Sequence, residues 1–236
     1  MSPGGGALGA VLLAGGLARR MGGVDKGLVT LGGRTMIERV IDAVDPHVDA
    51  LVIVANRNAG AYAAFGPPVV PDRLAGHLGP LAGLAAGLHA LDTRRAFMCP
   101  CDSPFVDPRL APRLDDACAA LGVEVAVAHD GERLQPVFAV VRRETLDSLE
   151  RFLAAGRRKI DAWYAERAAV EVDCRDLADS FRNINTEAER AAAEAELDGA
   201  VAAGAAAGAG DGAGDGAAGG ADVRGTVGVA DGGEPS

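Results

Sequence analysis

Residues 7–28, ALGAVLLAGGLARRMGGVDKGL, decide the fold class of this chain. The first nine of them form a short apolar run ending in glycine, which is typical of a β-strand buried on both faces of a parallel sheet. The loop that begins at this last residue has four glycines, Gly15, Gly16, Gly22 and Gly23. Because glycine is costly to order, such a loop after a strand indicates backbone that approaches a ligand closely.

Two familiar phosphate-binding patterns are absent from this loop. The Walker pattern G-x-x-x-x-G-K-[ST] fails because Lys26 precedes Gly27, and the dinucleotide fingerprint G-x-G-x-x-G fails because Gly15 and Gly16 are adjacent. The loop is instead about a dozen residues long and also carries the cations Arg19, Arg20 and Lys26. Backbone amides together with cations suit a polyphosphate whose charge shifts to a leaving pyrophosphate.

Apolar runs alternate with helical patterns along the rest of the chain. Strands are predicted at 50–56, 67–72, 95–102, 123–130, 135–141 and 169–173. Helices are predicted after Thr35, over 79–91, from Asp107–Pro108 to about Leu121, around 146–153 and from Thr186. This order predicts a three-layer α/β/α domain with a mostly parallel, Rossmann-like sheet, in which 123–141 form a β-ribbon insertion.

In a parallel sheet, ligands bind beyond the carboxyl ends of the strands. The glycine loop follows the first strand, and three polar residues, Asn56, Asp72 and Asp102, follow the next three predicted strands. The site is therefore predicted at this edge. Asp102, in CPCDSP, is a candidate ligand for Mg²⁺ that bridges phosphates; on its own it is equally compatible with an ordinary turn.

Composition bounds the remaining possibilities. Ten of the 33 acidic residues but only two of the 23 basic residues lie after residue 186, so the preceding part carries a net charge of only about −2. A near-neutral body argues against a nucleic-acid surface. No apolar run is long enough to span a bilayer, and the four cysteines show no metal-type spacing. We expect a cytoplasmic protein with one domain over 1–190 and a disordered Ala/Gly/Asp-rich tail over 191–236.

Five segments in the same order resemble the molybdenum cofactor guanylyltransferase (MobA) family of the nucleotidyltransferase superfamily. They are LLAGGLARRMGGVDKGL (12–28), PDRLAGHLGPLAGL (71–84), CPCDSP (99–104), RLQPVFAV (133–140) and FRNINTEAE (181–189). The resemblance implies a nucleotide-diphospho-sugar-transferase-like fold with a GTP half over about 7–105 and an acceptor half over about 106–190. It also implies transfer of GMP from GTP to the terminal phosphate of molybdopterin, with release of pyrophosphate. Transient contact with molybdenum-insertion proteins or apo-molybdoenzymes is expected, and no nucleic-acid or membrane partner.

The resemblance assigns roles residue by residue. GTP is expected to contact Leu13, Ala14, Gly15, Gly16, Gly23, Lys26, Asn56, Asp72 and Asp102. The expected catalytic residues are Arg20, Lys26 and Asp102, the last also holding Mg²⁺, and the expected acceptor-side residues are Gln135, Asn183 and Asn185. Glu187 stands where the family commonly has proline in NINTPE, and the tail lies outside the family pattern.

Several alternatives remain open on the sequence. The basic cluster of Arg157, Arg158 and Lys159 either binds the molybdopterin phosphate or forms a solvated turn after Gly156, and Asp72 contacts either guanine or the ribose. A cytidylyltransferase, or a transferase for another small phosphorylated acceptor, is the main alternative enzyme. A non-catalytic module that delivers nucleotide or cofactor is the alternative outside enzymes, and the presence of both Lys26 and Asp102 argues against it.

Overall fold

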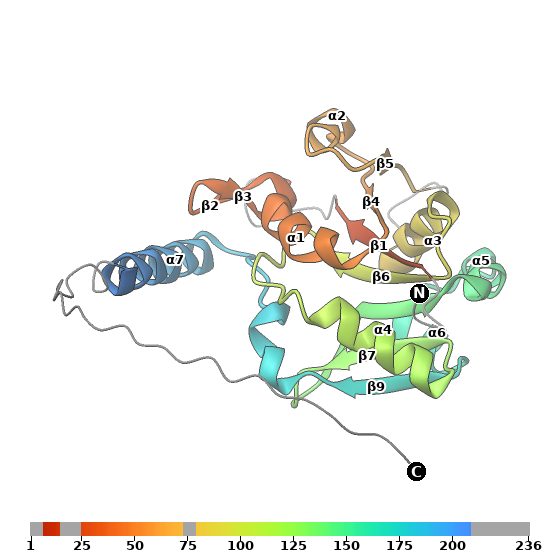
Figure 1. Ribbon diagram of the computed structural model, residues 1–236. Coiled ribbons are helices and arrows are strands. Elements are labelled where there is room, and N and C mark those ends of the chain that lie inside the picture. The colour runs from red at the N-terminus through yellow and green to blue at the C-terminus, as the bar shows by residue number, and fades with distance from the viewer. Residues whose placement is uncertain (1–6, 15–24, 73–78, 209–236) are drawn as a thin grey trace, which may run out of the picture. The chain divides into compact units, whose positions relative to one another are not determined.

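A seven-stranded sheet forms the centre of the protein (Figure 1). The structure is a computed structural model, and it describes residues 7–14, 25–72 and 79–208. The strands of the sheet are β1 (Leu8–Leu13), β4 (Ala50–Val54), β5 (Val69–Val70), β6 (Arg95–Pro100), β7 (Val125–His129), β8 (Leu134–Arg142) and β9 (Ala169–Asp173), in the spatial order β5-β4-β1-β6-β8-β7-β9. Only β8 runs antiparallel to its neighbours. The prediction of a mostly parallel sheet is confirmed. The predicted strand pair over 123–141 also forms, and both of its strands belong to the central sheet.

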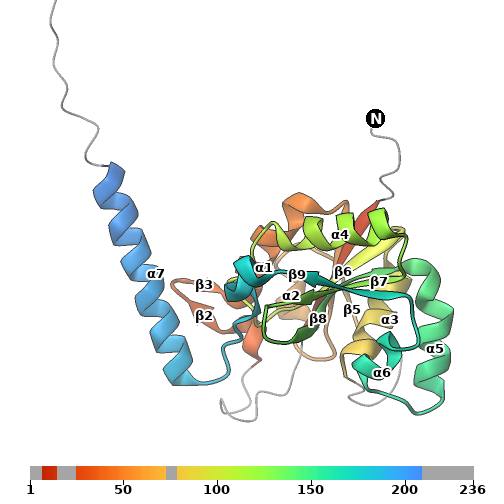
Figure 2. The ribbon, with the colours of Figure 1, turned by 90° about the horizontal axis from the view of Figure 1, so that it is seen from below.

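Helices cover both faces of the sheet, which gives the predicted three layers (Figure 2). On β1, Ala10 and Leu12 pack in one core cluster with α1 (Met36–Val44) and α4 (Leu110–Leu121). Val11 points to the other face, in a second cluster with α3 (Pro80–Ala90), α5 (Leu146–Ala154) and α6 (Ile160–Tyr164). This alternation follows from the two-residue period of a strand. A strand apolar at both sets of positions is thereby buried on both sides.

Local sequence signals set the ends of the helices. Thr35 and Glu38 form the predicted capping box at the start of α1, with each side chain bonded to the other residue's backbone. The predicted start of α4 is wrong: Asp107 caps a turn by accepting from the Arg109 amide at 2.8 Å, and the α-helix begins only at Leu110. An aspartate can cap a single turn as well as a helix, so the sequence signal did not distinguish them.

Short elements without a clear apolar period were not predicted. They are the hairpin of β2 (Thr30–Leu31) and β3 (Arg34–Thr35), the helix α2 (Ala59–Ala63), the helix α6, and the 3₁₀ turns η2 (Lys26–Leu28), η3 (Asp45–His47), η4 (Arg143–Thr145) and η5 (Arg175–Phe181). Such elements are stabilised by contacts made across the fold rather than by their own pattern. Two of them, η2 and α2, border the candidate site.

The strands end level with one another at the edge where the site is predicted. Leu13 is in register with both Val54 of β4 and Pro100 of β6, and Val54 is in register with the last residue of β5. Two positions beyond the last residues of β4, β5 and β6 lie, respectively, Asn56, Asp72 and Asp102. The fold thus brings these three positions to one sheet edge, as predicted.

The last helix, α7 (Glu187–Gly208), begins at the predicted capping box, where the Glu189 amide donates to Thr186 Oγ1 at 3.2 Å. The boundary of the tail predicted at residue 191 needs correction, because α7 continues past it and Ala193 is fully buried against Val29, Leu31 and Met36. Alanine is the best helix former, so a composition that resembles a disordered tail also suits a helix. The chain divides into a compact unit ending at Leu197 and a second unit from Asp198. Residues 209–236 lie outside the described part.

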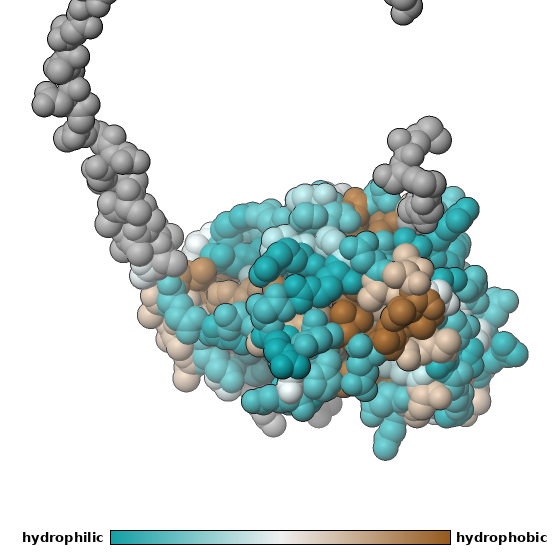
Figure 3. Space-filling view, turned by 60° about the horizontal axis from the view of Figure 1, so that its bottom comes forward, coloured by the Kyte–Doolittle hydropathy of each residue, from teal (hydrophilic) through white to brown (hydrophobic). Residues whose placement is uncertain are grey.

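Among the described helices, none is long and apolar enough to cross a membrane. On the face shown in Figure 3, hydrophilic residues predominate and the hydrophobic ones form separate patches. Among the described residues, Leu121 at the end of α4 has an exposed large hydrophobic side chain.

Candidate active site

Lys26 joins two of the predicted site residues. Its ammonium Nζ lies 3.1 Å from Asp102 Oδ2 and donates to Asn185 Oδ1 at 2.5 Å. Lys26 comes from the end of the glycine loop, Asp102 follows β6 and Asn185 precedes α7, so three segments far apart in sequence meet here. The side chains of Lys26 and Asp102 are 19% and 18% exposed, which leaves them partly shielded yet accessible.

The segment around Asn185 is fixed against the end of β6 by its neighbours. Ser103, fully buried, donates its hydroxyl to Asn183 Oδ1 at 2.6 Å, and the Ile184 amide donates to the Asp102 carbonyl at 3.4 Å. On the other side, Glu189 accepts from the amides of Asn185 and Thr186, and these bonds lower the pKa of its carboxyl. The segment is therefore held at both ends, and Ser103 is a site residue that sequence reasoning missed.

Asn56 and Asp72 form a second pair at the same edge. The Asn56 side-chain amide donates to Asp72 Oδ2 at 2.7 Å, while Asn56 Oδ1 accepts from the Asp72 backbone amide at 2.7 Å. A Cβ placed at Gly83 of α3 would lie 2.6 Å from the Leu13 side chain and 3.7 Å from Asp72 Oδ1. The glycines of α3 thus let this helix lie close to β1 and to Asp72. The predicted close approach of this helix to a strand is confirmed.

Leu13 and Ala14 each use one backbone group in a hydrogen bond to a neighbouring strand or the residue after it. The Leu13 carbonyl accepts from the Cys101 amide at 3.0 Å, and the Ala14 amide donates to the Val54 carbonyl at 2.8 Å. The contact of Leu13 and Ala14 with nucleotide remains a prediction. The other predicted residues of the glycine loop, Gly15, Gly16, Arg20 and Gly23, lie outside the described residues, as does Arg19.

The other residues predicted on the acceptor side, Gln135, Arg157 and Arg158, each contact other parts of the protein. Gln135 is buried and donates to Asp130 Oδ2 at 2.6 Å. Arg157 pairs with Glu166 at 2.5 Å and lies over the Phe152 ring, and Arg158 donates to backbone carbonyls at the end of α5. In the described structure, no contact joins these three residues to Lys26 or Asp102. The arginines thus have structural roles at the end of α5, and binding to molybdopterin remains a prediction for them.

Asp25 is held by two residues of the α2 region that the sequence did not single out. Tyr62 donates its hydroxyl to Asp25 Oδ1, and the Asn58 amide donates to Asp25 Oδ2 at 3.1 Å. No local sequence signal connects residues more than 30 positions apart, so only the fold reveals this contact.

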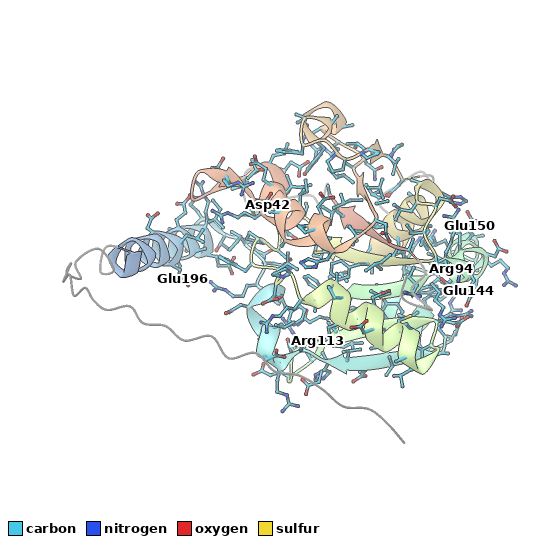
Figure 4. All side chains as sticks on the ribbon, in the orientation of Figure 1. Asp42, Arg94, Arg113, Glu144, Glu150 and Glu196 are labelled. Carbon is cyan, nitrogen blue, oxygen red and sulfur yellow. The ribbon has the colours of Figure 1, made fainter. Side chains whose placement is uncertain are left out.

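A cleft of about 780 Å³ lies at the opposite edge of the sheet, away from these residues. Its lining includes Arg94 and Arg95 at the start of β6, Arg142 at the end of β8, and Glu144; Figure 4 shows Arg94 and Glu144 at the α5 end of the structure. Both arginines and carboxylates line this cleft, and Arg95 pairs with Asp115 and Arg142 with Glu144. Because it lies at the amino end of the parallel strands, this cleft is not the predicted nucleotide site.

The donor set at the candidate site suits Mg²⁺ that is shared with a phosphate ligand. No cluster of three or more His, Cys, Asp or Glu side chains able to hold a metal occurs in the part of the chain that the structure describes. Magnesium commonly takes one or two protein carboxylates and completes its coordination with water and substrate phosphates. Asp102, partly exposed at the carboxyl edge, fits such a single-carboxylate role.

The chain is similar to known proteins over most of its length. Residues 10–170 match the MobA-like NTP transferase domain. A protein of Shewanella baltica named molybdenum cofactor guanylyltransferase is 46% identical over 177 residues, which cover 75% of this chain and 90% of that protein. One of the same name from Shewanella putrefaciens is 45% identical over 181 residues, 77% of this chain and 93% of that protein.

A solved structure shares the fold. The molybdopterin-guanine dinucleotide biosynthesis protein A of Archaeoglobus fulgidus superposes with a TM-score of 0.70 at 26% sequence identity, over 81% of this chain and 99% of that one. The part of the chain that matches the family, residues 10–170, contains Lys26, Asn56, Asp72 and Asp102.

Proposed function

Because this chain belongs to the MobA-like NTP transferase family, we propose that it transfers GMP from GTP to the terminal phosphate of molybdopterin. The products are the guanine dinucleotide form of the cofactor and pyrophosphate. The names of the relatives support guanylyl transfer to this acceptor. The observation that carries the proposal is the meeting of Lys26, Asp102 and Asn185 at the carboxyl edge of the sheet.

The reaction needs alignment and charge neutralisation more than acid–base chemistry. An oxygen of the acceptor phosphate attacks the α-phosphorus of GTP, a new P–O bond forms, and the bond to the β-phosphate breaks with its electrons leaving on pyrophosphate. The attacking phosphate is already anionic, so no general base is required. This agrees with a described site built from lysine, carboxylate and amide groups rather than histidine.

Lys26 is the cation best placed for this work among the described residues. Its ammonium contacts Asp102, on the predicted GTP side, and Asn185, on the predicted acceptor side. A cation between two anionic phosphates reduces their repulsion and stabilises charge that develops between them. Asn185 and Asn183 contribute neutral polar groups at the acceptor side, in positions set by Ser103 and Glu189.

Asp102 is the proposed protein ligand of Mg²⁺. When bound, the ion supplies charge neutralisation on the nucleotide phosphates. Asp102 itself lies two residues beyond the end of β6, and the amide of Ile184 donates to its carbonyl, so its position is set by the sheet and by the acceptor-side segment together. In the absence of nucleotide, Lys26 balances its charge at 3.1 Å.

The Asn56–Asp72 pair is the proposed contact for the nucleoside. Asn56 holds Asp72 by two hydrogen bonds, one to the carboxylate and one from the backbone, so the carboxylate is presented in a fixed orientation. A carboxylate can accept from the N1–H and exocyclic amine of guanine, or from the hydroxyls of ribose. Only the first arrangement selects GTP against CTP.

Nucleotide selectivity tests the proposal. Purified protein, Mg²⁺ and molybdopterin are incubated with GTP, CTP or ATP, and pyrophosphate release is followed with and without the acceptor. We expect GTP to be used far faster than the other two, and only when the acceptor is present. Equal or faster use of CTP would show a cytidylyltransferase instead, and nucleotide binding without turnover would favour a delivery module.

A further inference from the structure

We propose that Tyr62 and Asn58 are positioning residues for the transfer reaction: they clamp the Asp25 carboxylate and thereby fix Lys26, the next residue, at the active site. The proposal rests on the proposed function for its kinetic consequence, but the clamp itself is a property of the free protein. The term clamp is used below for the side chains of Asp25, Asn58 and Tyr62.

The clamp engages both oxygens of one carboxylate from a single short segment. Tyr62 donates its hydroxyl to Asp25 Oδ1, and Asn58 donates its side-chain amide to Oδ2 at 3.1 Å. Tyr62 is fully buried. Burial, and then the neighbouring Cys101 and Asp25, raise the pKa of Tyr62 far above its ordinary value, so the hydroxyl keeps the proton that it donates. Hydrogen bonds to an ionised acceptor are about twice as strong as neutral ones.

The Asn58 side chain bonds to Asp25 rather than capping the start of its own helix, α2. It occupies the N-cap position of α2, where asparagine usually accepts from the first turn of the helix, yet no side-chain cap bond forms. Its backbone is left-handed, with φ of 53°. Among the described residues, no other non-glycine residue has a positive φ. Asparagine tolerates this conformation better than most residues. The Asn58 side chain is thus directed away from α2 and towards Asp25.

The turn after Asp25 is also built around the tyrosine hydroxyl. A Cβ placed at Gly27 would lie 2.6 Å from Tyr62 Oη and 2.7 Å from Cys101 Sγ, so a side chain here would force Tyr62 or Cys101 to shift. The backbone of Gly27 therefore lies directly against the group that holds Asp25. This contact explains the glycine of the Asp25–Lys26–Gly27 sequence, which the sequence analysis left without a role.

Asp25 and Lys26 are coupled through a short 3₁₀ turn. The Leu28 amide donates to the Asp25 carbonyl at 3.1 Å, and the Val29 amide donates to the Lys26 carbonyl at 3.0 Å. With Asp25 fixed at one end and the Gly27 backbone packed on Tyr62, the intervening residue has little freedom of backbone orientation. Its side chain then reaches Asp102 and Asn185. Misplacing a catalytic group by about 1 Å can lower a rate about 100-fold.

Amide hydrogen exchange tests the clamp without any substrate. In Tyr62→Phe, we expect exchange at Leu28 and Val29 to accelerate about fivefold, as loss of one charge-assisted hydrogen bond lowers the local opening energy. Asn58→Gly, which keeps a residue that accepts positive φ, should act in the same direction. Tyr164→Phe is the matched control, because Tyr164 is also buried and donates its hydroxyl to the Pro136 carbonyl at 2.7 Å, in another part of the fold. It should leave exchange at Leu28 and Val29 unchanged.

A kinetic cycle tests whether the clamp acts through Lys26. The single-turnover rate constant for GMP transfer, at saturating GTP and acceptor, should fall about ten- to 100-fold in Tyr62→Phe. In a Lys26→Ala background the same substitution should change the remaining rate less than about twofold, because the group that the clamp positions is gone. A general structural defect would instead cause the same loss in both backgrounds.

The two measurements separate the possible failures. Faster exchange together with a kinetic loss that depends on Lys26 supports the proposal. Unchanged exchange in both Tyr62→Phe and Asn58→Gly overturns it, and so does an equal kinetic loss with and without Lys26. If the wild-type protein transfers no GMP, the proposed function fails, while the exchange measurement still decides whether the clamp fixes this turn.

Discussion

The Lys26 ammonium bridges Asp102 and Asn185, at 3.1 Å and 2.5 Å, and so connects the segment proposed to bind nucleotide with the segment proposed to bind the acceptor. The two partners differ in kind, because Asp102 is a carboxylate and Asn185 a neutral amide. When substrates bring phosphate groups to this edge, Lys26 can exchange these contacts for stronger ones to phosphate. The arrangement therefore keeps a charged lysine partnered and in place before substrates bind.

Replacement of Asp102 by alanine should greatly lower turnover while GTP binding is retained. Loss of the proposed Mg²⁺ ligand should lower kcat by at least about 100-fold, in the range found when one electrostatic contact to a transition state is removed. Binding of GTP, measured by calorimetry, should persist through the Asn56–Asp72 pair. Asp92→Ala is the matched control, since Asp92 is exposed in the cleft at the opposite edge. Normal turnover by Asp102→Ala would remove Asp102 from the mechanism.

Replacement of Ser103 by alanine should weaken use of the acceptor more than use of GTP. The hydroxyl of Ser103 fixes Asn183 at 2.6 Å, so its loss frees the acceptor-side segment. We expect KM for molybdopterin to rise several-fold while KM for GTP changes little, with a loss of stability of about 1 kcal/mol. Ser180→Ala provides the comparison, because Ser180 is equally buried and accepts from the Asp107 amide at 2.9 Å. A similar rise in KM for both variants would mean that Ser103 has only a structural role.

Replacement of Gly87 by alanine should destabilise the domain. A Cβ at this position of α3 would lie 2.4 Å from both methyl groups of Val11 in the central strand, so helix and sheet must separate. The expected loss is about 1–3 kcal/mol in the free energy of unfolding, from denaturant titration. Gly60→Ala in α2, where a Cβ meets nothing within 4 Å, should be neutral or stabilising by up to about 1 kcal/mol. Equal stability of the two variants would contradict the close packing of α3 on β1.

Most of the fold could be predicted from the sequence, because the strands of a doubly covered sheet are continuous apolar runs. Residues 7–15, 50–56, 67–72 and 95–102 each contain an observed strand, and the order of strands and helices predicted the layers. The elements that were missed, such as α2 and the β2–β3 hairpin, are short and have no sustained period. The extent of α7 was missed because alanine-rich sequence favours helix and flexible tail alike.

The candidate site was predictable where a residue lies just beyond the end of a strand. Asn56, Asp72 and Asp102 were placed at one edge by topology alone. The contacts of Tyr62 with Asp25 and of Ser103 with Asn183 join residues 37 and 80 positions apart, and nothing in the local sequence marks such pairs. Arg157 and Arg158 show the opposite difficulty. Their charges suggest a phosphate site, yet in the fold Arg157 pairs with Glu166 and Arg158 donates to the Leu153 carbonyl.

The turn between β7 and β8 should give the protein an acid-sensitive contribution to stability. Hydrogen bonds from the Arg133 and Glu132 amides, and then from Gln135, lower the pKa of Asp130 to about 2. Because the folded value lies below the unfolded value of about 3.9, this contribution is present above about pH 4 and is lost as the pH falls through 2. Asp130→Asn should be less stable than wild type at pH 7, and the difference should shrink between about pH 4 and pH 2. A constant difference across this range would contradict the account.

The fate of each phosphate of GTP tests the central claim most directly. GTP labelled at either the α- or the γ-phosphate is supplied with Mg²⁺ and molybdopterin, and the products are separated. We predict that the α-label appears in a molybdopterin-linked guanine dinucleotide and the γ-label in pyrophosphate, in equal amounts. Transfer of the γ-label to the acceptor, or release of the α-label as free GMP with acceptor unchanged, would contradict guanylyl transfer by this protein.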